Sequence, residues 1–124
     1  MPQKTIAIIG ASRDEKKYSH KAIKAFLNSG YKVYPVNPHA SKIGGLDCYG
    51  DLEDLPEKVE EISIYLPPYL TIGILQSLVD YPVKKIYLNP GSADDIVRDI
   101  AQKFKLPVVE ACSIRAQGQD PDML

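Results

Sequence analysis

The chain has 124 residues, which fits one domain spanning residues 1–124, because domains most often contain about 100–150 residues. Fifteen Lys and Arg nearly balance sixteen Asp and Glu, and the formal net charge of -1 argues against a nucleic-acid-binding protein. The longest apolar runs, such as residues 6–9, are far shorter than the roughly 20 residues of a membrane-spanning helix, so we expect no membrane insertion.

The N-terminal residues lead directly into an apolar run, without the charge, apolar stretch and cleavage site of a signal peptide. We therefore expect a cytoplasmic protein. Two cysteines, Cys48 and Cys112, are too few for a disulfide framework or a metal cluster. We expect both to be reduced thiols, with a redox role as the alternative.

Short apolar runs alternate along the chain with amphipathic stretches, which is typical of a parallel sheet covered by helices. The predicted strands span residues 5–9, 31–36, 62–66, 85–88 and 107–109. The predicted helices run from about 19 to 29, from the prolines at 67–68 to about 79, and from about 92 to 103. Residues 37–50 are expected to form a long loop, followed by one helical turn at 51–55.

These elements predict an α/β Rossmann-like fold, a doubly wound five-stranded parallel sheet with right-handed crossovers and strand order 3-2-1-4-5. Pro35 cannot donate to a strand ladder, so we expect a bulge or an unpaired position in the second strand. Ligands of such sheets bind at the carboxyl ends of the strands, where the strand order reverses. This order puts the reversal between the first and fourth strands.

The first strand ends in Gly10-Ala11-Ser12-Arg13, and a helix follows with Ser19 as its expected N-cap. A glycine lets backbone N–H groups approach a phosphate, and a helix N-terminus favours negative charge. This loop has one glycine where the dinucleotide fingerprint G-x-G-x-x-G has three, so a plain glycine turn is the alternative interpretation.

The second strand ends in Asn37-Pro38-His39, where an NAD-binding domain usually has an acid that hydrogen-bonds the ribose hydroxyls. The missing acid disfavours NAD and permits a phosphorylated ribose, as in coenzyme A or NADP. Arg13, His39 and Lys42 could supply cationic or donor contacts, with a solvated surface lysine as the alternative for Lys42.

The third and fourth strands end in rigid turns without titratable groups, Leu66-Pro67-Pro68 and Asn89-Pro90-Gly91. Such prolines can form a flat apolar wall for an adenine ring or a pantetheine arm, or can simply end a strand.

No catalytic or metal-binding pattern emerges from the sequence. The two histidines, His20 and His39, lack a recognisable partner for general acid–base catalysis. The serines lie outside any G-x-S-x-G motif, and no His, Cys and Asp residues have the spacing of metal ligands. We therefore predict a binding protein that is not an enzyme and holds no metal.

Five segments together resemble the CoA-binding domain family, in particular its small stand-alone members. They are Ile-Ile-Gly-Ala-Ser at 8–12, Gly-Tyr-Lys-Val-Tyr-Pro-Val-Asn-Pro at 30–38, Leu-Pro-Pro at 66–68, Asn-Pro-Gly at 89–91 and Val-Glu-Ala-Cys at 109–112. Their order and spacing agree with the family over nearly the whole chain. A similar domain forms the nucleotide-binding part of the succinyl-CoA synthetase alpha subunit, whose phosphorylated histidine belongs to a second domain.

The resemblance implies that the phosphates of coenzyme A lie over Gly10, Ala11, Ser12 and Arg13, with Ser19 and His20 in the adjoining helical turn. It implies adenosine or pantetheine contacts at Asn37, Pro38, Lys42, Leu66, Pro67, Pro68, Asn89, Pro90 and Gly91. The predicted function is thus non-enzymatic binding of coenzyme A or acyl-CoA, in a carrier, a sensor or a partner of an acyl-CoA enzyme. A minimal NADP-dependent oxidoreductase and a protein-interaction domain without a ligand are the alternatives.

Overall fold

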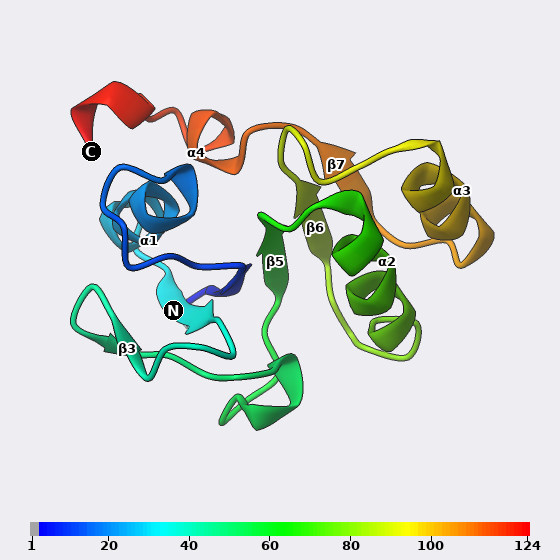
Figure 1. Ribbon diagram of the computed structural model, residues 1–124, viewed down its shortest axis with the longest axis horizontal. Coiled ribbons are helices and arrows are strands. Elements are labelled where there is room, and N and C mark those ends of the chain that lie inside the picture. Colours follow the sequence, from blue (N-terminus) through cyan, green and yellow to red (C-terminus); the bar gives the residue numbers. More distant parts are fainter. Residues whose placement is uncertain (1–2) are drawn as a thin grey trace.

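A five-stranded parallel sheet with helices on both faces forms the centre of the computed structural model, which describes residues 3–124 (Figure 1). The strands lie in the order β2-β1-β5-β6-β7. Their bounds are Thr5–Ile9 for β1, Lys32–Val36 for β2, Glu61–Ile64 for β5, Lys85–Leu88 for β6 and Val108–Glu110 for β7. This architecture confirms the predicted α/β Rossmann-like fold.

Four α-helices cover the sheet, with α1 and α4 on one side and α2 and α3 on the other (Figure 1). Their bounds are Tyr18–Asn28 for α1, Pro68–Ser77 for α2, Asp95–Lys103 for α3 and Ser113–Ala116 for α4, and two 3-10 turns span Leu52–Asp54 (η1) and Pro121–Met123 (η2). Each face has its own apolar cluster. Ile23 and Phe26 of α1 pack under one face, while Leu75 of α2 and Val97 of α3 pack under the other.

The predicted strand order is wrong in one respect, because the third main strand lies beside the first. In the structure β5 pairs with β1 from Ile6 to Ile9, so the order of the main strands is 2-1-3-4-5 and the reversal falls between β1 and β5. Pro35 explains the difference, because the predicted order would have put β2 inside the sheet. As an edge strand, β2 tolerates a residue that cannot donate to a ladder.

The expected loop at 37–50 contains a small antiparallel hairpin made of β3 (Lys42–Ile43) and β4 (Leu46–Asp47). Gly44 and Gly45 connect the strands with φ of 58° and 81°, which fits a type I′ turn. Ile43 is only 1% exposed and belongs to the same apolar cluster as Ile23 of α1. The hairpin is therefore anchored to the helix that follows β1.

Two further expectations about helices need correction. The N-cap of α1 is Lys17, and Ser19 lies buried inside the first turn. The helix expected to reach about residue 79 ends at Ser77, so Val79 lies beyond it and is 43% exposed. The helix expected from about residue 92 begins at Asp95, and Ile96 in its first turn is 59% exposed. Within residues 3–124, no helix is both long and apolar enough to cross a membrane.

Buried polar groups in the core satisfy one another. Both carboxylate oxygens of Glu61 accept hydrogen bonds from the Tyr31 hydroxyl, at 3.1 and 3.0 Å, and both residues are buried. Burial and the Glu61 carboxylate raise the pKa of the Tyr31 hydroxyl, so Tyr31 remains a hydrogen-bond donor. The pair ties the start of β2 to β5 on the other side of β1.

Gly10→Ala is expected to lower the free energy of unfolding by at least about 2 kcal/mol, as measured by urea denaturation. Gly10 has φ of 84°, and an added Cβ would lie 2.9 Å from the backbone oxygen of Tyr65. Gly30→Ala is the matched control, because Gly30 has a similar φ of 86° but nothing within 4 Å of the added atom. Equal losses in the two variants would contradict the steric argument.

Tyr31→Phe is expected to cost about 1–3 kcal/mol of stability, because it leaves the buried Glu61 carboxylate without its donor. Because the pKa of Tyr31 is raised in the folded protein, the free energy of unfolding depends on pH. The contribution of Tyr31 to stability is complete below about pH 10, the usual tyrosine pKa, and is lost as the pH rises above it. The free energy of unfolding should thus fall less steeply above pH 10 in Tyr31→Phe than in the wild type. Exposed Tyr69→Phe, as control, should retain the wild-type slope.

Candidate functional site

The carboxyl ends of β1, β2 and β5 surround a cavity of about 470 Å³. Its walls are mostly apolar, and its volume lies within the roughly 300–1,000 Å³ of small-molecule sites. The wall residues are Ile9, Gly10, Val36, Asn37, Pro38, His39, Gly50, Asp51, Leu52, Tyr65, Leu66, Leu70 and Ile74. The cavity therefore lies at the reversal of strand order, where sheets of this kind bind their ligands.

Asn37 fixes the loops around this cavity. Its side-chain amide donates to the Ala11 carbonyl oxygen at 2.8 Å, and its side-chain oxygen accepts from the backbone N–H of His39 at 2.8 Å. The backbone N–H groups of Gly10 and Ala11 both donate to the Val36 oxygen, at 3.0 and 3.2 Å. The turns after β1 and β2 are thus joined to each other, and Asn37 is a wall residue whose polar atoms already have partners.

The loop from Ser12 to Lys17 leads from the cavity to the N-terminus of α1. The Ser12 hydroxyl accepts from the backbone N–H of Asp14, and the Asp14 carboxylate accepts from the N–H of Lys16, both at 3.0 Å. The backbone N–H groups of Ser12 and Arg13 make no hydrogen bond with any residue in 3–124, and Lys17 provides no side-chain cap. This combination of open donors and an uncapped helix is suited to an anion.

His20 holds this loop in place through a hydrogen bond to Ser12. Its ring is 4% exposed, and Nδ1 lies 2.7 Å from the Ser12 carbonyl oxygen. A carbonyl oxygen only accepts, so Nδ1 carries a proton and donates it. Ser19, next to it, is also buried. Both residues therefore lie where the sequence predicts them, in the helical turn beside the loop. The hydrogen bond from the His20 ring holds Ser12 in position.

The cations predicted for the site, Arg13, His39 and Lys42, lie in different places. His39 lines the cavity. Arg13 is exposed in the loop before α1, together with Lys16 and Lys17, and these three residues form no ion pair with any residue in the described range. Lys42 lies on the β3–β4 hairpin, where its ammonium group pairs with Asp47 at 3.3 Å, and it does not line the cavity. Three unpaired basic side chains therefore lie in the loop before α1, next to the open N–H groups of Ser12 and Arg13.

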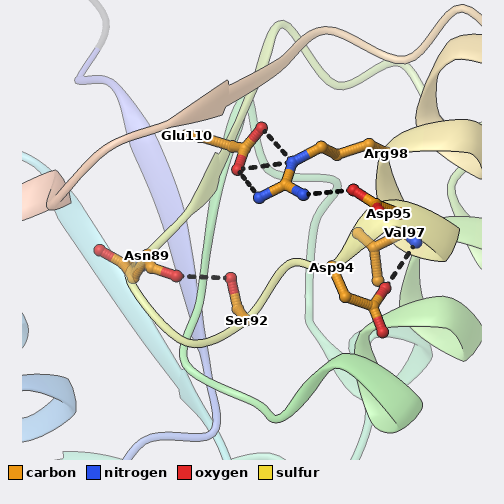
Figure 2. A network of polar contacts seen from close by, with 7 residues as sticks. All are labelled: Asn89, Ser92, Asp94, Asp95, Val97, Arg98 and Glu110. Carbon is orange, nitrogen blue, oxygen red and sulfur yellow. Dashed lines mark hydrogen bonds and ion pairs between the residues drawn. The ribbon is translucent and has the colours of Figure 1, made fainter.

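A separate hollow of about 280 Å³ lies at the ends of β6 and β7, where Asn89, Pro90 and Gly91 form part of the wall. Figure 2 shows that Arg98 of α3 reaches across to Glu110 of β7. The Arg98 guanidinium donates to both carboxylate oxygens at 2.9–3.1 Å and also to Asp95 at 3.0 Å. The hydrogen bonds from Arg98 lower the pKa of Glu110, so the pair remains charged.

The two proline turns therefore do not meet in one pocket. Leu66 lines the larger cavity, while Pro67 is the N-cap of α2 and Pro68 is its first residue. The Asn-Pro-Gly turn lines the smaller hollow. Gly10, Asn37, Pro67 and Gly91 nevertheless all follow the carboxyl ends of parallel strands, so they share one edge of the sheet.

Asn89 is 2% exposed and holds this edge together. Its amide donates to the Ser63 hydroxyl at 2.8 Å and to the Ile64 carbonyl oxygen at 2.9 Å, and its oxygen accepts from the backbone N–H of Ser113 at 2.8 Å. Ser113 also meets the Tyr65 hydroxyl at 3.1 Å, and burial raises the pKa of Tyr65 to about 12. Asn89 thus has a structural role that its sequence position did not reveal.

Sequence reasoning missed eight wall residues, namely Ile9, Val36, Gly50, Asp51, Leu52, Tyr65, Leu70 and Ile74. Leu66, Leu70 and Ile74 are spaced by four residues, so helical periodicity could have identified the last two. No local sequence pattern identifies Asp51 as a wall residue. Its presence also corrects the inference that no acid lies near the end of the second strand, because a distant segment supplies one.

Cys48 and Cys112 are both free, and burial raises the pKa of the Cys48 thiol. Among residues 3–124, no three His, Cys, Asp or Glu side chains are grouped so that they could hold a metal ion.

Known proteins similar to this chain include long ligases, of which it matches a small part, and proteins of similar length, which it matches over most of their sequence. Acetate–CoA ligase (ADP-forming) II of Archaeoglobus fulgidus is 32% identical over 95 residues, which are 74% of this chain. That match covers only 14% of the ligase, and a match to the Methanocaldococcus jannaschii ligase covers 16%, so the chain spans about a seventh of these relatives. A hypothetical protein from Pyrococcus horikoshii OT3 represents the second group, with a TM-score of 0.85, 27% identity and coverage of 94% of this chain and 82% of that one.

A larger solved structure contains the same fold as one part. The dinucleotide forming acetyl-coenzyme A synthetase 1 of Ca. Korarchaeum cryptofilum, in complex with phosphate and ADP, has a TM-score of 0.73 and 27% identity. The match covers 88% of this chain and 26% of that one. The family model described as CoA binding domain matches residues 4–117, from just before β1 to the end of α4. The chain therefore belongs to the CoA binding domain family.

Proposed function

We propose that this chain binds coenzyme A at the carboxyl edge of its sheet and does not itself catalyse a reaction. The observation that carries the proposal is the junction at Gly10. On one side of it lies the cavity of about 470 Å³, and on the other the open N–H groups of Ser12 and Arg13 lead to α1. An adenosine and the diphosphate attached to it need two such compartments side by side.

The apolar cavity is suited to the adenine ring. Leu52, Leu66 and Leu70 contribute aliphatic walls, and Gly10 brings the backbone close without a side chain. The diphosphate would then lie over Ser12 and Arg13, where the dipole of α1 and the free charges of Lys16 and Lys17 attract it. Asp14 and Glu15 moderate this attraction without cancelling it, since residues 12–17 carry three basic and two acidic side chains.

The pantetheine arm would extend along the sheet edge towards the hollow formed by Asn89, Pro90 and Gly91. This hollow is next in order, because β6 lies beside β5 in the sheet. The Arg98–Glu110 pair closes its far side with one charge of each sign. An uncharged arm with amide groups is compatible with such a wall.

The non-catalytic part of the proposal is supported by how the polar side chains at this edge are used. Nδ1 of His20 donates to the Ser12 carbonyl, and the amide of Asn89 is used within the protein. The burial that raises the pKa of Tyr65 to about 12 makes it a poor general base near neutral pH.

A partner that performs the chemistry is part of the proposal. Its support is that similar proteins carry a comparable domain as 14% of an acetate–CoA ligase and 26% of an acetyl-coenzyme A synthetase. We propose that this chain presents coenzyme A to an acyl-CoA enzyme.

Titration calorimetry tests the proposal directly. Coenzyme A should bind saturably with one site per chain. NADP should bind at least tenfold more weakly, because the cavity holds one adenosine and the adjoining edge of the sheet suits an extended pantetheine arm. Absence of heat with coenzyme A, together with no thermal shift, would refute the proposal. Tighter binding of NADP would support the oxidoreductase alternative instead.

Leu70→Trp should weaken coenzyme A binding by about tenfold or more, because the larger side chain fills a cavity of about 470 Å³ from its rim. Leu70 is 45% exposed, so the substitution should leave the fold intact. Val79→Trp is the control, since Val79 is equally exposed at 43% but lies outside the cavity wall. A similar loss of affinity in both variants would show that the cavity is not the binding site.

A further inference from the structure

Asp51 reaches the cavity by an indirect route. Tyr49 runs beside the outer edge of β2, where its N–H donates to the Pro35 oxygen at 3.0 Å and its oxygen accepts from the N–H of Asn37 at 2.9 Å. Val36 and Tyr49 form an isolated parallel bridge. Asp51 follows two residues later and lines the cavity together with Asn37 and Pro38. The chain thus brings an acid to the end of β2 from a segment more than ten residues away.

The segment that carries Asp51 is held close to the end of β2. A Cβ added to Gly50 would lie 4.0 Å from the Cα atom of Pro38, so the two backbones are near each other. Asp51 is the N-cap of η1, where its carboxylate accepts from the N–H of Glu53 at 3.5 Å. Asp51 therefore contributes to the cavity wall from the start of η1, and it stays exposed to solvent.

Asp51 dominates the charge of the cavity. Among the wall residues it is the one with a formal charge at pH 7, when histidine is counted as neutral. It forms no ion pair with a Lys or Arg of the described range. It also borders a second hollow, whose wall contains the acids Glu53, Glu57 and Asp80. Lys58 is the basic residue in that wall, and Lys32 pairs with Glu57 at 3.3 Å.

In dinucleotide-binding sheets, an acid at the end of the second strand accepts hydrogen bonds from ribose hydroxyls and disfavours a ribose phosphate. Here Asn37 occupies that sequence position, and Asp51 lines the same cavity. We infer that Asp51 is a specificity-determining residue that accepts a hydrogen bond from a ribose hydroxyl of the bound adenosine and opposes a phosphate on that ribose. This inference rests on the proposed function, because it presumes that the cavity holds the adenosine.

The inference separates two closely related ligands. Coenzyme A carries a 3′-phosphate on its ribose, whereas dephospho-coenzyme A carries a hydroxyl there and is otherwise identical. A carboxylate near the ribose repels the phosphate and accepts from the hydroxyl, so its charge lowers the affinity for coenzyme A relative to dephospho-coenzyme A. Replacing the charge by an amide removes the repulsion and retains an acceptor oxygen.

The test measures the dissociation constants of both ligands by calorimetry for the wild type, Asp51→Asn and Asp80→Asn. Asp51→Asn should shift the ratio of the two constants about tenfold in favour of coenzyme A. Asp80→Asn makes the same chemical change in the neighbouring hollow, outside the cavity, and should shift the ratio less than twofold. At about 1 M salt, where the Debye length is about 3 Å, the effect of Asp51→Asn should shrink.

The outcomes distinguish this inference from the proposed function. Binding of both ligands with a ratio that Asp51→Asn leaves unchanged, or shifts towards dephospho-coenzyme A, overturns the role of Asp51 and leaves coenzyme A binding intact. Absence of binding by the wild type overturns the proposed function itself. Thermal unfolding of Asp51→Asn should match the wild type, because asparagine keeps the oxygen that caps η1.

Discussion

The candidate site depends on the hydrogen-bonded junction between the turns that follow β1 and β2. Two successive N–H groups, from Gly10 and Ala11, donate to the Val36 carbonyl, and Asn37 returns a hydrogen bond to Ala11. Only a residue without a side chain fits at Gly10, since its Cβ would press on the Tyr65 backbone. The junction places an apolar cavity and an uncapped helix on opposite sides of one glycine.

The position of β5 decides which strands surround this junction. Because β5 pairs with β1, the reversal of strand order falls next to Gly10, and Tyr65 and Leu66 complete the cavity wall. In the order expected from the sequence, β5 would have followed β2 and the cavity would have lost that wall. Asn89 then extends the same edge, since its hydrogen bonds tie the end of β6 to β5 and α4. The ends of β1, β2, β5 and β6 thus lie along one edge of the sheet.

The sequence predicted the features that depend on local patterns. Apolar runs located β1 and β6 to the residue, and the glycine and asparagine after β1 and β2 marked two wall positions. Strand order is a property of the whole sheet. Pro35 predicts a bulge or an unpaired position, whereas in the structure it marks an edge strand. Asp51 could not be predicted, because the pairing of Tyr49 with β2 is a contact between segments that no local pattern encodes.

Charge is nearly balanced over the whole chain, so any electrostatic selectivity must come from how a few charges are placed. At this edge they are placed asymmetrically. Arg13, Lys16 and Lys17 stand unpaired where α1 begins, whereas Asp51 is part of the cavity wall. A nucleotide with its diphosphate over α1 and its ribose hydroxyls towards Asp51 satisfies both ends, and the reversed nucleotide satisfies neither. Under the proposed function, the same asymmetry would orient the ligand and would make the site sensitive to a phosphate on the ribose.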